Sequence, residues 1–414
     1  MRTVVWLVLL FVVAVVAASS LGSNDGLVSL YWGGWRADLS LNFFVLLVLG
    51  ACFLILTASR AMAALVALPQ RAREWRALQR ERAAQRALRE AQLEFFAARY
   101  ARAARAAERA VAIAEEARTW PEAGEVRALA QLLAAASAHR LQDRPRRDHR
   151  LKQAQDQAAA GLPRVVGEGA QLLCAEWALD DRNADAALQM IEALPAGVAR
   201  RTQALRLKLQ AARLARRPME ALRTARLLAK HQAFTADAAL GLVRSLAGEA
   251  LDAAHDADQL RRAWAALEPA ERADPRIASR AARRAVTFEA GADARAWLAP
   301  LWDRMAEMPA DDRAAVALAL AAAAEGVEVP WLARVDKALA TWPADPAVAA
   351  AAGAVLVQRQ LWGKARAPLE QAAAAPALDP LARRSAWRHL AELARQEGDE
   401  SRAARCERAA AGLA

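Results

Sequence analysis

The amino-acid sequence predicts an all-α protein, in which an N-terminal two-helix transmembrane hairpin precedes an α-solenoid of stacked helix pairs. Residues 3–24 and 39–59 contain no charged side chain, and each stretch is long enough to cross about 30 Å of hydrocarbon as a helix. From residue 70 onward, segments rich in Ala, Leu, Arg and Glu are separated by proline and glycine. These segments have helical length and lack the alternation that strands require, which indicates stacked helix pairs.

This pattern divides the 414 residues into three parts. We expect a transmembrane helical hairpin at 1–68, with a short external loop at about 22–38. Residues 69–118 should form a basic juxtamembrane helix that leads into the repeats, and 119–414 should form the solenoid. A composition of 56% hydrophobic and 25% charged residues argues against a disordered chain.

A basic run follows the second apolar stretch and predicts the topology. The positive-inside rule places this run, both termini and the solenoid in the cytoplasm. The chain has a net charge of +11, which suits nucleic acid or anionic lipid. Because the run adjoins a membrane span, we expect lipid headgroups, at roughly 1 kcal/mol per arginine, and no nucleic acid. The run comprises Arg71, Arg73, Arg76, Arg80, Arg82, Arg86 and Arg89.

The loop between the two apolar stretches has a pattern of its own. Residues 28–32 and 35–39 have the character of two short strands around Gly33-Gly34, and a Gly-Gly pair tolerates the positive φ angles of a tight hairpin turn. Trp32 and Trp35 flank this turn, and amphipathic rings are favoured at a membrane interface. The loop is either an interfacial connector or a contact for an external partner.

The C-terminal end gives the sharpest repeat signal. Trp387, Leu390 three residues later, a turn at Gly398 and the small residue Ala403 have the spacing of a tetratricopeptide repeat. One unit upstream, Gly353 occupies a position where a missing side chain lets two helices approach. We therefore predict divergent tetratricopeptide-like repeats, whose stacked helix pairs form surfaces suited to protein binding.

No motif in the sequence predicts an enzyme. Residues 165–172 imitate a dinucleotide-binding loop, but Leu172 stands where the third glycine belongs. The five histidines are scattered without metal-ligand spacing, and the three cysteines form no pair, so we expect no metal site and no catalytic residue. A single histidine can still bind haem iron axially, which leaves haem or porphyrin open as a ligand with its binding residues unknown.

Taken together, these features resemble the HemY family, the haem-biosynthesis-associated membrane proteins of Gram-negative bacteria. The resemblance covers essentially the whole chain, including the hairpin from Gly26 to Ser40, the arginine-rich exit, the Leu260-x-x-x-Trp264 helix and the terminal repeats. It implies a multi-pass protein of the bacterial inner membrane, associated with late steps of protohaem synthesis. An unrelated flavin-dependent protoporphyrinogen oxidase shares the name, but it requires a glycine-rich FAD fingerprint that this sequence lacks.

The leading functional hypothesis is a non-enzymatic, membrane-anchored scaffold or adaptor. Its repeats would gather enzymes of late porphyrin and haem synthesis, such as ferrochelatase, and its basic segment would contact membrane lipids. Two alternatives stay open: a haem- or porphyrin-binding carrier, and a general adaptor in envelope assembly.

Overall fold

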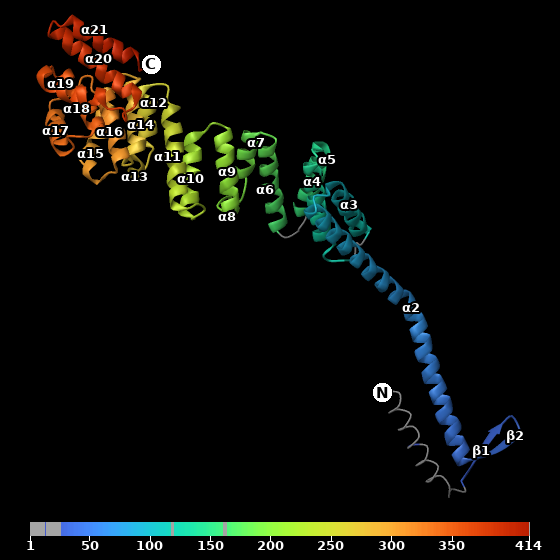
Figure 1. The fold of residues 1–414 in the computed structure, drawn as a ribbon. Coiled ribbons are helices and arrows are strands. Elements are labelled where there is room, and N and C mark those ends of the chain that lie inside the picture. Colours follow the sequence, from blue (N-terminus) through green and yellow to red (C-terminus); the bar gives the residue numbers. More distant parts are fainter. Residues whose placement is uncertain (1–12, 14–25, 117–119, 160–163, 414) are drawn as a thin grey trace. The chain divides into compact units, whose positions relative to one another are not determined.

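The computed structural model describes residues 26–116, 120–159 and 164–413, together with Val13. The first predicted span, residues 3–24, lies outside the described residues except for Val13. The described part is helical almost throughout and includes one two-stranded sheet, which confirms the predicted all-α solenoid class (Figure 1). The chain forms two compact units, Met1–Pro163 and Arg164–Ala414. The sequence pattern suggests a division at 118, whereas the contacts divide the chain after Pro163.

The first unit opens with the β-hairpin expected from the Gly-Gly pair. Strands β1 (Leu27–Trp32) and β2 (Trp35–Ser40) are antiparallel, with Trp32 opposite Trp35 at the tip. Gly33 and Gly34 have φ angles of +55° and +94°, the left-handed region that a tight hairpin turn requires. The predicted hairpin is thus confirmed, and it lies directly before the next helix.

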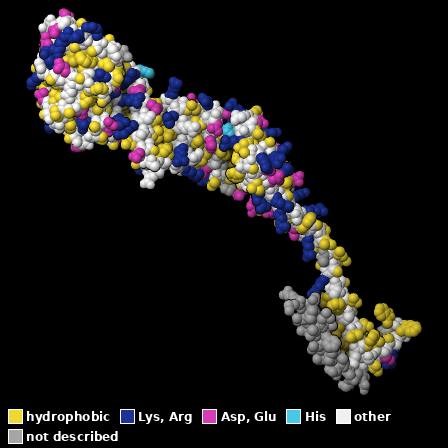
Figure 2. All heavy atoms as spheres, in the orientation of Figure 1, with side chains coloured by type: hydrophobic (Ala, Val, Ile, Leu, Met, Phe, Trp, Pro, Cys, Tyr) yellow, Lys and Arg dark blue, Asp and Glu magenta, His cyan; other side chains and the backbone are white. Residues whose placement is uncertain are grey.

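Helix α2 (Leu41–Phe96) is one continuous helix that contains Pro69. It therefore joins the apolar stretch to the basic run, across the boundary expected after residue 68. Its N-terminal part is long and apolar enough to cross a membrane by length and composition, and it is the one such helix in the described part of the chain. Figure 2 shows this hydrophobic part of α2 followed by a region dense in basic side chains.

The C-terminal part of α2 packs on the helices that follow. Ala84, Leu88 and Ala91 are buried there. The remaining helices of this unit are α3 (Tyr100–Glu116), α4 (Ala123–Arg140) and α5 (Arg144–Ala159). Each contacts the next, and their facing alanines let the helices approach closely.

The second unit is a series of helices that share one continuous hydrophobic core. Its elements are α6 (Arg164–Asp180), α7 (Ala184–Glu192), α8 (Ala196–Ala199), α9 (Thr202–Leu214), α10 (Pro218–Lys230), α11 (Ala236–Asp252), α12 (Ala257–Ala265), α13 (Pro269–Arg272), α14 (Pro275–Val286), α15 (Gly291–Trp302), the 3-10 helix η1 (Met305–Glu307), α16 (Ala310–Ala322), α17 (Pro330–Thr341), α18 (Pro346–Gln358), α19 (Trp362–Ala374), α20 (Pro380–Gln396) and α21 (Glu400–Ala411). Within this series α11, α14, α16, α18 and α20 each contact the next along the row, as stacked repeats require.

A recurring backbone turn joins the helices. Besides Gly398 (φ +78°), non-glycine residues adopt the left-handed conformation at equivalent turns, for example Gln142, Arg182 and Gln360 at φ of about +60°. The next residue then begins or caps the following helix, as Asn183 does by accepting a hydrogen bond from Ala186 N. This turn geometry thus recurs at several helix connections of the described chain, although glycine marks few of these turns.

Candidate binding groove

The candidate site is built on α18, which is buried on all sides. Every residue from Ala347 to Val357 has less than a tenth of its surface exposed, and most are alanine or valine. A helix that is apolar all round must be surrounded by neighbours. At Gly353, an added Cβ would lie 2.6 Å from Leu369 Cδ2, so only glycine permits the observed approach of α18 and α19.

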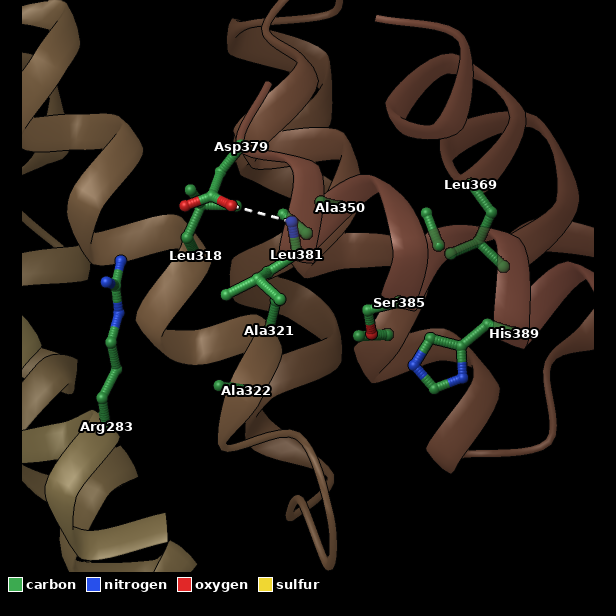
Figure 3. A pocket seen from close by; sticks show the side chains of 13 residues that line it. Arg283, Leu318, Ala321, Ala322, Ala350, Leu369, Asp379, Leu381, Ser385 and His389 are labelled. Carbon is green, nitrogen blue, oxygen red and sulfur yellow. Dashed lines mark hydrogen bonds between the residues drawn. The ribbon is translucent and has the colours of Figure 1, made fainter. Parts of the chain in front are cut away.

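A groove opens beside α18, between α14, α16 and α20 (Figure 3). It encloses about 230 Å³. Its lining is mostly apolar and comprises Arg283, Leu318, Ala321, Ala322, Ala350, Ala354, Leu369, Asp379, Leu381, Ala382, Ser385, Ala386 and His389. Small side chains form its floor, while Leu381 stands at the rim with 67% of its surface exposed. Such a shape offers apolar contact with a few polar groups at the edges.

Ion pairs between successive helices explain why polar groups are left free at this groove. Upstream of it, a carboxylate in the first turn or at the N-cap of each helix is paired with an arginine of the preceding helix in the row. The pairs are Arg244–Asp274 at 2.7 Å, Arg276–Asp312 at 3.0 Å and Arg313–Asp345 at 2.9 Å. α18 presents no arginine for the next step, because its sequence is almost entirely small and apolar.

Asp379, the N-cap of α20, is the carboxylate at which this series stops. Its Oδ1 accepts a hydrogen bond from Leu381 N at 2.8 Å, and it forms no ion pair with any described residue (Figure 3). Arg283 of α14 is exposed at another wall and likewise makes no ion pair within the described chain. The groove therefore combines an apolar floor with one free carboxylate and one free guanidinium.

His389 closes the far end of the groove. It lies one helical turn after Ser385 on α20, and both side chains face the cavity (Figure 3). Burial lowers the pKa of His389 below its ordinary value of 6.5, and the nearby Glu392 offsets this only in part. The Nδ1 atom lies 3.8 Å from Glu392 Oε2. The imidazole is consequently neutral near pH 7, with a nitrogen lone pair for a ligand.

The seven predicted arginines of the basic run lie on α2, and none of them lines the candidate groove. All of them are exposed, and none forms an ion pair with a described residue. Arg86 donates from Nε to the carbonyl oxygen of Arg82 at 3.1 Å. Their charges are therefore available to an anionic surface, which is the role that the sequence pattern predicted for Arg71, Arg73, Arg76, Arg80, Arg82, Arg86 and Arg89.

The residues predicted to pack the repeats occupy the last two helix pairs. Leu390 and Ala403 are 1% and 2% exposed, and Trp387 is half-buried against the core. Gly398 forms the left-handed turn between α20 and α21. These residues support the helices that carry the groove, but sequence reasoning missed the groove itself. The sequence signal for the groove was the series of Arg and Asp residues about one repeat apart, which is interrupted because α18 contains no arginine.

A second concavity surrounds stacked tryptophans. Trp264 and Trp297 stack with ring centroids 4.8 Å apart, beside Pro300 and the exposed Arg272. Trp264 is only 9% exposed and belongs to the core with Leu260. Core packing thus explains this pair. No group of three or more potential metal-ligating side chains occurs among the residues that the structure describes.

Comparison with known proteins identifies the N-terminal part. Residues 26–142 match the family model described as HemY protein N-terminus. No curated protein matches the chain. Among solved structures, a chain of Naa15/Naa10 bound to HypK-THB aligns with 13% identity and a TM-score of 0.24, over 76% of this chain and 56% of that one. The present chain thus spans little more than half the length of that structure, and a likeness this low supports no inference.

Proposed function

Because residues 26–142 match the HemY N-terminus model, we propose that the chain is a HemY-type, membrane-anchored scaffold or adaptor for enzymes of late porphyrin and haem synthesis. The family name supports an association with haem biosynthesis, and the apolar part of α2 supports attachment to a membrane. Both termini and the second unit would face the cytoplasm of a bacterial inner membrane, because the arginines follow the span.

The groove beside α18 is the observation that carries the scaffold proposal. It is formed by consecutive helices of a repeat series, the arrangement by which solenoids bind extended segments or helices of other proteins. Its chemistry favours a segment with small or aliphatic side chains over the alanine floor. A basic group of that segment would pair with Asp379, and an acidic group would pair with Arg283.

Affinity purification from membranes tests this role with two matched variants. Leu381→Glu places a charge at the rim of the groove, whereas Leu227→Glu makes the same change at a leucine of α10 that is 47% exposed and does not line this groove. The wild-type chain and Leu227→Glu should recover haem-pathway enzymes such as ferrochelatase. Leu381→Glu should reduce this recovery about tenfold, which corresponds to about 1.4 kcal/mol of binding free energy.

Two outcomes of this experiment contradict the proposal. Equal recovery by all three proteins would exclude the groove as the docking site. Recovery of only unrelated proteins would exclude the haem pathway. A deletion strain with normal porphyrin intermediates and disturbed secretion would favour the alternative of an adaptor in envelope assembly.

A haem- or porphyrin-binding carrier is the second candidate, and His389 is the observation that favours it. Haem iron takes a neutral imidazole as an axial ligand, and His389 is held neutral in an apolar groove that also contains Arg283. Titrating haem into the purified full chain should then give a saturable Soret shift, which His389→Ala should abolish. Absence of any saturable shift would exclude the carrier and leave the scaffold proposal untouched.

A further inference from the structure

The β1–β2 hairpin has one apolar face and one polar face. In an antiparallel pair, residues directly opposite each other share a face, and successive residues alternate between faces. One face therefore carries the pairs Val28–Leu39, Leu30–Ala37 and Trp32–Trp35. The other carries Leu27–Ser40, Ser29–Asp38 and Tyr31–Arg36, and is the polar face because four of these six residues are polar or charged.

The apolar face is open in the structure. Trp32 is 88% exposed, Trp35 84% and Leu30 46%. A contiguous exposed apolar patch of this kind marks an interaction site, and a lone two-stranded hairpin is marginally stable in water. We therefore expect another apolar surface to shield this face from water.

The polar face is ordered and suited to water. Asp38 accepts hydrogen bonds from Ser29 Oγ and from Arg36 Nε, the latter at 3.0 Å. The hydrogen bond from Ser29 has the larger effect and that from Arg36 the smaller, and both hold the pKa of Asp38 below its ordinary value. The carboxylate therefore remains ionised near neutral pH. The guanidinium of Arg36 also lies over the ring of Tyr31, 5.7 Å from its centroid. Charged and polar groups are thus confined to one side of the hairpin.

The junction with α2 fixes the hairpin at the end of the apolar helix. β2 ends at Ser40 and α2 begins at Leu41, with no residue between them. Leu41 N donates to Gly26 O at 2.8 Å, and the Ser40 side chain caps α2 by accepting from Phe43 N at 3.4 Å. When α2 crosses a membrane, the hairpin must therefore lie at the lipid–water boundary, where tryptophan is favoured.

We propose that β1–β2 is an interfacial anchor, which lies on the membrane with its apolar face among lipid headgroups and upper acyl chains. The occupant of that face is the bilayer itself, because the face is continuous with a helix that is long and apolar enough to span it. The amphipathic hairpin thereby acts as monotopic amphipathic helices do, with an ordered polar side toward water.

Adjacent residues on opposite faces provide the test. In the full chain with Cys52, Cys174 and Cys406 replaced by alanine, Ala37→Cys reports on the apolar face and Arg36→Cys on the polar face. The protein is placed in nanodiscs of phosphatidylethanolamine and phosphatidylglycerol, so that a membrane-impermeant maleimide reaches both leaflets. Each labelling rate is divided by the rate of the same variant in denaturant.

We expect Ala37→Cys to label about tenfold more slowly than Arg36→Cys, which corresponds to about 1.4 kcal/mol of protection. Leu30→Cys, cross-strand from Ala37, should be protected in the same way and serves if Ala37→Cys fails to fold. Equal normalised rates on both faces in nanodiscs would overturn the proposal. Protection that exists in native membranes but disappears in nanodiscs of the purified chain would also overturn it, because a protein partner would then cover the face.

Discussion

Gly353 offers the strictest test of how the repeats pack. A Cβ at this position would lie 2.6 Å from Leu369 Cδ2 and 2.7 Å from Leu369 Cγ, but at an ordinary 3.4 Å from the Leu369 backbone nitrogen. The conflict is therefore with one side chain. Leu369 is only 1% exposed, so it has little room to move. Gly353→Ala should consequently strain the contact between α18 and α19.

The expected magnitude is the difference between two effects. Overpacking a core by one methyl group costs about 1–3 kcal/mol, while replacing a mid-helix glycine by alanine gains about 1 kcal/mol. Gly353→Ala should therefore destabilise α18 and α19 by about 1 kcal/mol. Leu369→Ala costs about 2–5 kcal/mol by itself, but it removes the obstructing atoms. In that background Gly353→Ala should stabilise by about 1 kcal/mol, so its sign reverses.

Hydrogen exchange by mass spectrometry measures the stability of α18 and α19 separately from the rest of the chain, because each repeat in a solenoid opens with its own free energy. Peptides from α18 and α19 are followed in the two single variants, the double variant and the wild type. Gly241→Ala is the matched control: it lies within α11, and an added Cβ there meets nothing within 4 Å, so it should stabilise by about 1 kcal/mol. The reasoning is refuted if Gly353→Ala stabilises both backgrounds as Gly241→Ala does.

Three further predictions follow from other parts of the chain. Arg295, 5% exposed, donates to the carbonyl oxygens of Ala323, Glu325 and Gly326, so Arg295→Met should destabilise the α16–α17 connection by about 3–5 kcal/mol; unchanged hydrogen exchange there would contradict this. Because burial lowers the pKa of His389, its contribution to stability is complete above pH 6.5 and is lost as the pH falls below that value; His389→Gln should flatten the pH dependence of α20 unfolding, and an unaltered profile would argue against it. A reporter after Ala414 should read cytoplasmic and one between Gly33 and Gly34 external, while glutamine at all seven arginines of the basic run should give mixed orientation; an external C-terminal reporter in the wild type would contradict the scaffold.

The helical class and the β1–β2 hairpin were predictable because their signals are local. Apolar periodicity sets the helices, and the Gly33-Gly34 pair sets the turn with its positive φ angles. Most repeat boundaries were less predictable, because the same left-handed turn is formed by residues such as Gln142 and Gln360. An L-residue adopts this conformation at a cost of about 1–2 kcal/mol, which surrounding packing offsets, so no glycine marks the turn.

The groove was not predictable from motifs, because it depends on an ion-pair partner that α18 does not provide for Asp379. Asp379 has the same Asp-Pro sequence as Asp274 and Asp345, and only the structure shows that those two are paired while Asp379 is not. In the sequence, His389 is likewise one of five scattered histidines, with no motif around it. Its burial and its place in the groove come from the packing of α20 on α18.

Site-specific photocrosslinking in intact cells tests the central claim most directly. A photoreactive amino acid is placed at position 381, at the rim of the groove, and at position 227 as the exposed control on α10. The scaffold account predicts a crosslink from position 381 to an enzyme of late haem synthesis and none from position 227. Crosslinks of equal yield from both positions, or crosslinks from 381 only to proteins outside that pathway, would contradict it.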